Sequence, residues 1–371
     1  MANRYWVGGT STWNSTAGSK WSLTSGGSGG ETIPGQNDDV FFDANSGVNT
    51  ITISGGAVSK SLNTNGFSGT IQGSSAIDIY GDFILGSFTT WDYTGAIKLR
   101  SQSTNNVIKP GDSSLGLVSL NNDLEIIGSS SSIFTLQAGL NSSKSLTLTS
   151  GIFDTNNKNI TFKGFTCESS SPCSVILGSS TITCTDYIYS WTITNSLMTL
   201  DSGTSTIVLL MLASPPAIFY GGSLIYYNLT LFYSGTYTIM GNNTFNSISI
   251  TSNTTCNFQE NSLTTFIADQ SLIGDSSGYI TLSSRTPGTK YNFYKSSGVF
   301  YTRYINLGDS WASGGALFSA LNFVDSGNNN GWNFFFPSSR PPSVKQKSFN
   351  SVVPSVKQKS FKSSFPSVKL Q

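Results

Sequence analysis

The feature that most constrains this chain is an alternation of apolar and polar residues that recurs along most of its length. The pattern is clearest in the segments 49–54, 76–85, 145–150, 159–165, 227–232 and 246–251. Its apolar members are Ile51, Ile53, Ile77, Ile79, Phe83, Leu85, Leu146, Leu148, Ile160, Phe162, Phe165, Leu229, Leu231, Ile248 and Ile250. Successive residues of a strand point to opposite faces, so a period of two predicts strands with one buried and one polar face.

Helix signals are nearly absent from the sequence. β-Branched and aromatic residues dominate the apolar positions, and Gly, Asn or Ser pairs interrupt the pattern about every 8 to 12 residues. The segments 145–165, 179–209 and 223–253 also resemble one another, each with short strands separated by a Gly or Asn turn. Loosely repeated units of roughly 20 to 30 residues, each too small to bury its own apolar face, are typical of a solenoid.

We therefore expect an all-β fold, a right-handed parallel β-helix or β-solenoid. An antiparallel β-sandwich or jelly roll is the alternative, because alternation and turn spacing alone do not distinguish parallel stacking from hairpins.

The ends of the chain differ from its middle. Residues 1–45 contain Trp6, Trp13 and Trp21 among Gly and Ser, and residues 301–337 are again rich in aromatic side chains. Because terminal solenoid units must cover exposed strand edges, we interpret both segments as caps on a body formed by residues 46–300.

A basic tail, residues 338–371, follows the second cap. The motif PSVKQKSF begins at Pro342 and again at Pro354, and PSVK begins at Pro366, a period of 12 residues. The tail holds seven of the 20 basic residues and no acid, which leaves 13 basic and 19 acidic residues, a charge of about −6, on the rest of the chain.

Such a repeat suits an extended peptide that docks on a neighbouring subunit, and a disordered solubilising tail is the alternative. Seven charges and three phenylalanines argue against nucleic-acid binding. The candidate docking residues are Val344, Lys345, Lys347, Phe349, Val356, Lys357, Lys359, Phe361 and Lys369.

Composition excludes several classes of chemistry. The chain has no histidine, so the usual general base near neutral pH and every Ser-His or Cys-His nucleophile are missing. The four cysteines form no CxxC pair, and no P-loop, dinucleotide or calcium-loop motif is present, so we expect no metal and no cofactor. A disulfide between Cys167 and Cys173 competes with unpaired, buried thiols. No apolar segment approaches the roughly 20 residues that span a bilayer.

The two end segments carry a resemblance. The opening block, matched on Tyr5, Trp6, Val7, Gly8, Gly9, Trp13, Trp21, Asp39, Val40, Phe42, Asp43 and Ala44, resembles a recurrent N-terminal block of bacteriophage fibre and appendage proteins. The closing block is similar to theirs at Gly327, Asn328, Asn329, Gly331 and Trp332. The resemblance covers residues 4–336 and implies a repetitive β-structure in a virion fibre, decoration or tail component; the basic tail departs from it.

Two kinds of functional site, one for cleaving and one for binding polysaccharides, are alternatives to a purely structural role. Polysaccharide cleavage needs two carboxylates across a groove, and the candidates are Asp38, Asp39, Asp78, Asp82, Asp123, Glu125 and Asp186, although acids in such turns usually satisfy backbone N–H groups. Glycan binding needs exposed aromatic rings, and Tyr187, Tyr189 and Trp191 alternate along one predicted strand, unless these rings belong to the core.

The sequence as a whole favours a non-catalytic structural protein of a virion, with other virion proteins as partners. We expect a homo-oligomer, a trimer by analogy with other fibres. A host-receptor or polysaccharide-binding or cleaving tailspike and a cell-surface adhesin are the alternatives.

Overall fold

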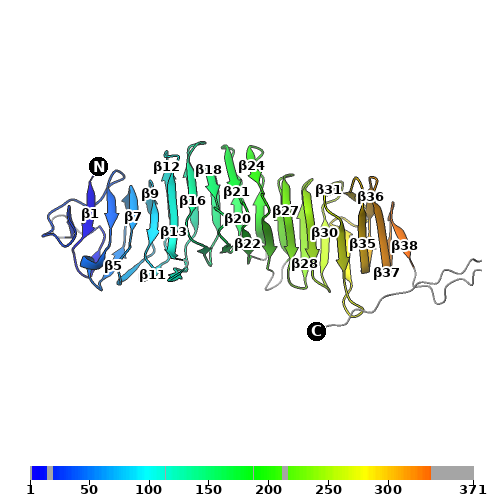
Figure 1. Cartoon of the computed structure of the whole chain (residues 1–371), viewed down its shortest axis with the longest axis horizontal. Coiled ribbons are helices and arrows are strands. Elements are labelled where there is room, and N and C mark those ends of the chain that lie inside the picture. The colour runs from blue at the N-terminus through cyan, green and yellow to red at the C-terminus, as the bar shows by residue number, and fades with distance from the viewer. Residues whose placement is uncertain (1, 15–19, 113, 187, 211–215, 336–371) are drawn as a thin grey trace, which may run out of the picture. The chain divides into compact units, whose positions relative to one another are not determined.

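The computed structural model describes residues 2–14, 20–112, 114–186, 188–210 and 216–335. The chain divides into a first unit, Met1–Phe336, which contains all of these residues, and a second unit, Pro337–Gln371. The first unit is a parallel β-solenoid of about 13 turns. Its strands lie side by side from β1 to β38 (Figure 1).

The longest stack of hydrogen-bonded parallel strands runs through almost the whole unit. We call it the long stack. It contains β6 (Ala57–Ser59), β9 (Ile77–Ile79), β12 (Ile97–Ser101), β15 (Leu124–Gly128), β18 (Leu146–Asp154), β20 (Phe165–Cys167), β23 (Tyr189–Ile193), β26 (Ala217–Tyr220), β28 (Thr236–Met240), β30 (Thr255–Phe258), β33 (Ile280–Ser284), β35 (Val299–Gly308) and β37 (Leu317–Gly327).

A second parallel stack lies in the N-terminal part and shares the second half of β18. It contains β1 (Asn3–Trp6), β4 (Asp39–Phe41), β7 (Ser61–Asn63), β10 (Phe83–Leu85), β13 (Asn106–Asp112), β16 (Ile133–Leu136), β21 (Cys173–Ile176) and β24 (Met198–Asp201).

The remaining parallel strands form three further groups. The first contains β2 (Ser11–Thr12), β5 (Thr50–Ile53), β8 (Thr70–Gly73) and β11 (Thr90–Tyr93). The second contains β17 (Leu140–Asn141), β19 (Ile160–Phe162), β22 (Thr181–Cys184), β25 (Thr206–Leu209), β27 (Ile225–Leu231), β29 (Thr244–Ile250), β31 (Leu263–Phe266), β34 (Tyr291–Tyr294) and β36 (Ser310–Ser313). The third adds β32 (Gln270–Ile273) and β38 (Asn333–Phe335) to β35 and β37.

Antiparallel pairing between named strands is confined, in the described residues, to β3 (Trp21–Ser22) with β1 and β14 (Gly116–Leu117) with β13. The only helix among them is the 3₁₀ turn η1 (Ala44–Ser46). The predicted all-β solenoid is therefore confirmed, and the sandwich alternative, which requires hairpin pairing, is wrong.

The alternation predicted from the sequence sets the core. All of its apolar members are buried, the most exposed being Ile250 at 6%. The parallel register places inward residues of consecutive turns directly over one another, as in the column Ala57, Ile77, Ile97, Leu124, Leu146, Phe165, Trp191, Phe219, Ile239 and Phe258. Each turn thus buries the apolar side of its neighbour. This burial is the driving force for folding that is expected of a solenoid.

A cluster of buried aromatic rings lies at the N-terminal end. Trp6, Trp13, Trp21 and Phe42 are at most 1% exposed, and the Trp6 and Trp13 rings lie 5.0 and 5.1 Å from that of Trp21. The Asp43 side chain caps η1 by accepting the backbone N–H groups of Asn45 and Ser46. In the opening block, the tryptophans and Phe42 therefore pack in the core, and Asp43 caps a helical turn.

Residues of the closing block pack against the last strands or form turns that favour glycine. Trp332 packs against Phe300 and Phe318, with ring centroids 5.7 and 5.4 Å away, and its Nε1 donates to the Ser310 hydroxyl at 3.0 Å. Gly327 and Gly331 adopt φ of 92° and 76°, conformations that favour glycine. Strands β35, β37 and β38 continue the parallel pairing through residues 301–335, so this segment forms the last turns of the solenoid.

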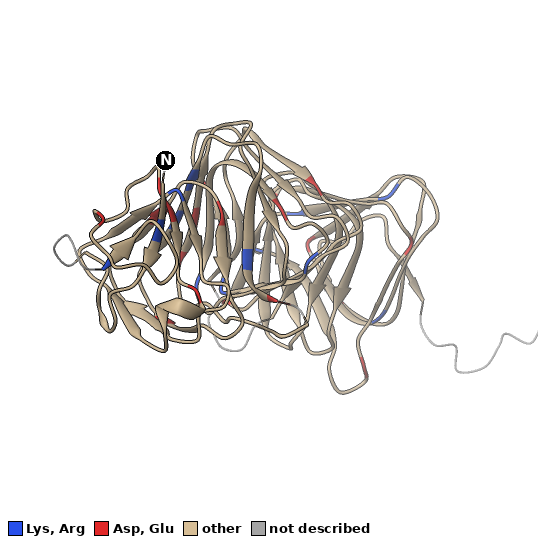
Figure 2. Ribbon diagram, turned by 60° about the vertical axis from the view of Figure 1, so that its left-hand side comes forward, with Lys and Arg blue, Asp and Glu red and all other residues tan. Residues whose placement is uncertain are grey.

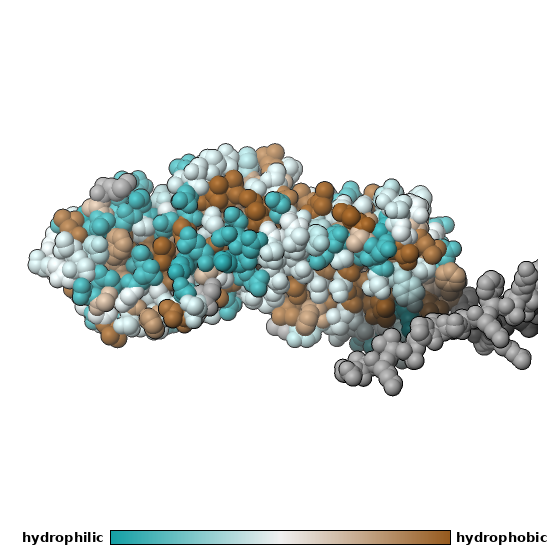
Figure 3. All heavy atoms as spheres, in the orientation of Figure 1, coloured by the Kyte–Doolittle hydropathy of each residue, from teal (hydrophilic) through white to brown (hydrophobic). Residues whose placement is uncertain are grey.

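The surface carries few charges. Figure 2 shows the charged residues spread along the ribbon, and the face drawn in Figure 3 is largely pale, with smaller hydrophilic and hydrophobic groups. This matches a sequence in which only 11% of residues are charged.

Candidate binding groove

The candidate docking residues of the tail, Val344 to Lys369, lie outside the described residues. Their predicted role stays a prediction.

The three aromatic residues proposed for glycan stacking do not share one face. Tyr189 is 58% exposed, whereas Trp191 is 1% exposed, and Tyr187 lies outside the described residues. Trp191 belongs to the inward column described above, stacked on Phe165 with a centroid distance of 4.5 Å. The predicted ring face therefore does not form, because Trp191 offers no surface to a ligand.

A β-bulge explains why Tyr189 and Trp191, which were expected to face the same way, point to opposite sides of the strand. The register between β23 and β26 shifts between Tyr189 and Trp191, so that Ile218 pairs with Tyr189 and the next residue, Phe219, pairs with Trp191. A bulge re-aims side chains relative to regular alternation. Tyr189 consequently points outward while the four residues after it are buried.

Tyr189 lies beside a surface groove over β18, β20 and β23. The groove has a volume of ≈ 430 Å³ and is lined by Ser145, Thr166, Glu168, Asp186, Tyr189 and Thr192. Two carboxylates, an exposed aromatic ring and three hydroxyls thus share one depression. We call it the Tyr189 groove.

Two threonines of the Tyr189 groove belong to one outward column of the long stack. Thr147, Thr166 and Thr192 are paired in register on β18, β20 and β23. The hydroxyls of Thr147 and Thr166 are 3.0 Å apart and hydrogen-bonded. Unlike these two half-buried residues, Thr192 is buried, at 3% exposure, and its Oγ1 lies out of reach of solvent without a hydrogen-bond partner.

The two acids of the groove, Glu168 and Asp186, lie in the segments next to β20 and β23. Asp186 precedes β23; its carboxylate lies 3.8 Å from the Lys163 Nζ and accepts the Ile188 N–H at 3.4 Å. Glu168 directly follows β20. The Ser190 hydroxyl donates to the Asp186 carbonyl oxygen at 2.6 Å, which ties the turn to the strand.

The other candidate acids are held by neighbouring groups. Asp39 pairs with Lys60 at 3.1 Å, Asp78 with Arg100 at 2.8 Å and Glu125 with Lys98 at 3.7 Å. Asp82 accepts the Val107 N–H and Asp123 the Ser145 N–H. These contacts give the acids structural partners, as expected for carboxylates in turns.

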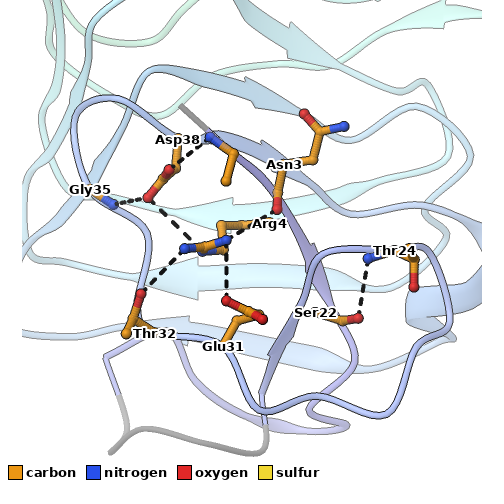
Figure 4. Close-up of polar contacts among 9 residues, drawn as sticks. Asn3, Arg4, Ser22, Thr24, Glu31, Thr32, Gly35 and Asp38 are labelled. Atoms are coloured by element: carbon orange, nitrogen blue, oxygen red, sulfur yellow. Dashed lines mark hydrogen bonds and ion pairs between the residues drawn. The ribbon is translucent and has the colours of Figure 1, made fainter.

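Asp38 shows the same behaviour at the N-terminal end (Figure 4). Its carboxylate accepts the backbone N–H groups of Ala2 and Gly35, both at 3.1 Å, and lies 4.0 Å from the Arg4 guanidinium. Arg4 also lies 3.5 Å from Glu31. Asp38 therefore fixes the first strand to the following turn.

The four cysteines are all buried with free thiols, so the structure contains no Cys167–Cys173 disulfide. The Asn195 amide donates to the Sγ of Cys173 at 3.2 Å and to that of Cys167 at 3.7 Å. A hydrogen bond from Cys167, together with the one from Asn195, lowers the pKa of the Cys173 thiol. Burial raises the pKa of Cys184 and of Cys256.

The described residues contain no group of three or more Cys, Asp or Glu side chains arranged to hold a metal ion. In the same residues, no helix has the length and apolarity needed to cross a membrane.

Sequence reasoning found Tyr189 and Asp186 but missed Thr166, Glu168 and Thr192 as members of one site. The Thr column could have been found by aligning the repeats turn by turn, since Thr147, Thr166 and Thr192 occupy equivalent positions. The bulge has no comparable signal in the sequence.

Comparison with protein-family models, with curated proteins and with solved structures gives no match for this chain.

Proposed function

We propose that this chain is a non-catalytic structural protein of a virion, a fibre, decoration or tail appendage, whose basic tail docks on a neighbouring subunit. The observation that carries the proposal is the parallel pairing of the long stack, which continues from β6 to β37. A stack in which every turn buries the apolar side of the next gives a stiff body without hinges. Such a body suits a protein whose task is to hold a position or bridge a distance.

The surface supports the same role. Most candidate acids are engaged by cations or backbone N–H groups, and only 11% of the residues of the chain are charged. Exposed apolar side chains such as Leu117, Ile225, Trp311 and Phe335 offer contact points for other copies or other virion proteins. On this proposal the protein is a homo-oligomer in the particle.

The charge distribution supports docking by the tail. The tail carries about +7 and the remainder of the chain about −6. Opposite charge favours contact between the tail of one copy and the body of another, and would weaken with rising salt.

The experiment compares the full chain with a variant lacking residues 338–371 during particle assembly. Particles released by lysis are separated from free protein on a density gradient, and the chain is quantified by mass spectrometry in both fractions. The proposal expects the full chain in the particle fraction and the truncated chain in the free fraction. Recovery of the full chain only as free protein would contradict the virion role, and equal incorporation of both forms would contradict the docking role of the tail alone.

A further inference from the structure

We propose that Cys167, Cys173 and Met198 form a buried binding site for a soft monovalent metal ion, Cu(I). The proposal goes beyond the structural role above and does not depend on it, because it rests on three sulfur atoms inside the solenoid.

The three sulfur atoms come from two consecutive turns. Cys167 ends β20, Cys173 begins β21, and Met198 begins β24, which pairs with β21. The register sets Met198 beside Cys173, and the Cys173 Sγ lies 3.4 Å from the Met198 Sδ. The thiols of Cys167 and Cys173 are joined by a hydrogen bond. Two thiols and one thioether therefore meet at one place in the core.

The distances suit an ion held between the sulfur atoms. A metal–sulfur bond is about 2.3 Å long, so one ion can contact two sulfur atoms that lie up to about 4.6 Å apart. The Cys173 Sγ and the Met198 Sδ are well within this limit. The Cys167 thiol, which is hydrogen-bonded to Cys173, supplies the third contact.

The Asn195 amide supports the two thiols. Its Oδ1 accepts the Leu197 N–H at 2.8 Å and its Nδ2 donates to the Ser171 carbonyl oxygen at 2.7 Å, which fixes the amide. The same Nδ2 lies 3.2 Å from the Cys173 Sγ and 3.7 Å from the Cys167 Sγ. A donor so placed stabilises the negative charge of metal-bound thiolates. On binding, each thiol releases its proton to solvent.

The kinds of ligand select the ion. Thiolates and thioethers are soft ligands and favour Cu(I), whereas Mg²⁺, Ca²⁺ and Mn²⁺ prefer oxygen ligands. A structural zinc site almost always has four ligands from Cys, His, Asp or Glu. Within the described part of the chain, no further Cys, Asp or Glu joins Cys167 and Cys173 in such a group. Cu(I) is stable at lower coordination, so the three sulfur atoms suffice.

Burial keeps water away from the sulfur atoms. Cys167 is 0% exposed, and Cys173 and Met198 are 5% exposed. Water is therefore excluded as a competing ligand. The spacing of the cysteines led us to expect no metal, because the third ligand is a methionine from the next turn and forms no motif with them.

The test is a titration of the full chain with Cu(I), kept reduced by ascorbate under argon, in competition with a coloured Cu(I) chelator. We expect one Cu(I) per chain. Cys173→Ser should weaken binding about a hundredfold and Met198→Leu about tenfold, since leucine keeps the shape and removes only the sulfur ligand. The matched controls Cys256→Ser and Met240→Leu remove a buried thiol from β30 and a buried thioether from β28, and both should bind like the wild type.

X-ray absorption at the copper edge gives a second readout, because it identifies the atoms bound to the ion. We expect sulfur neighbours alone, and one fewer in Met198→Leu. Cu(I) should also raise the melting temperature of the wild type more than that of Met198→Leu. The proposal is overturned if no stoichiometric Cu(I) binds, if Cys173→Ser and Cys256→Ser bind alike, if Met198→Leu binds like the wild type, or if Zn²⁺ binds more tightly than Cu(I).

Discussion

The indole Nε1 of Trp191 donates a hydrogen bond of 3.1 Å to the hydroxyl of Tyr226, which in turn donates to the carbonyl oxygen of Gly221 at 2.7 Å. Both rings are 1% exposed. This chain of hydrogen bonds satisfies the two polar groups that large aromatic side chains bring into an apolar core. It also places a titratable hydroxyl where burial raises its pKa above the ordinary tyrosine value.

Alkaline pH should therefore destabilise the fold. Burial raises the pKa of Tyr226 and of Tyr291 above the ordinary tyrosine value of about 10. Above about pH 10 the unfolded chain loses protons that the folded chain retains, so the free energy of unfolding falls as pH rises. Urea unfolding midpoints that decrease between pH 9 and pH 11 would agree with this, and the ultraviolet absorbance of tyrosinate reports the ionisation directly. Full ionisation of all 15 tyrosines near pH 10 in the folded protein would contradict it.

Tyr226→Phe provides the matched variant. It removes the acceptor for Trp191 and the donor to Gly221, so it should cost about 1–3 kcal/mol at neutral pH. It should also reduce the alkaline loss, because one buried ionisation is gone.

Removal of the Phe42 ring should open the N-terminal end. Phe42 packs against Trp6, Trp13, Trp21 and Phe67 with centroid distances of 5.9, 5.6, 5.8 and 5.6 Å. Phe42→Ala leaves a cavity among these rings, and we expect a loss of about 3–5 kcal/mol in the free energy of unfolding. Tryptophan fluorescence during denaturant titration measures it, and Phe88→Ala, which truncates a ring that is 66% exposed, is the control. Similar losses in both variants would mean that the aromatic cluster is not a cap.

The fold was predictable from the sequence because its signal is repeated many times. Each turn contributes its own alternation, as Ile77 and Ile79 do in one turn and Leu146 and Leu148 in another, and both pairs point inward. Parallel rather than antiparallel pairing followed from the likeness between segments, since only stacked copies bury equivalent residues on one another.

The candidate site was less predictable because it depends on a single irregularity. Alternation put Tyr189 and Trp191 on one face, but a shift of one residue at the bulge sends Trp191 into the core and leaves Tyr189 outside. A one-residue shift inverts the facing of every later residue of a strand. Glu168 and Asp186 line the same groove because of the register between successive turns. That register cannot be read from the sequence of either turn alone.

Thiol reactivity should distinguish Cys173 from the other cysteines. Hydrogen bonds from Cys167 and Asn195 lower the pKa of Cys173, whereas burial raises that of Cys184 and Cys256. Under native conditions we expect iodoacetamide to modify Cys173 first, because the thiolate is the nucleophile. Asn195→Ala removes one donor and should shift the pH midpoint of this modification upward, as followed by peptide mass spectrometry. An unchanged midpoint, or equally fast modification of Cys256, would count against the assigned hydrogen bonds.

Two glycines of the closing block, Gly327 and Gly331, should differ in their tolerance of a methyl group. Both have positive φ, so alanine at either position costs backbone strain of about 1–3 kcal/mol. A Cβ at Gly327 meets no atom within 4 Å, whereas one at Gly331 overlaps the backbone carbonyl oxygen of Ala312. Because that oxygen belongs to β36, Gly331→Ala must also displace a strand, and we expect a further loss of about 1–3 kcal/mol. Chemical denaturation of the two variants measures the difference, and equal stabilities would show that the close approach of Gly331 to β36 does not hold the last turn in place.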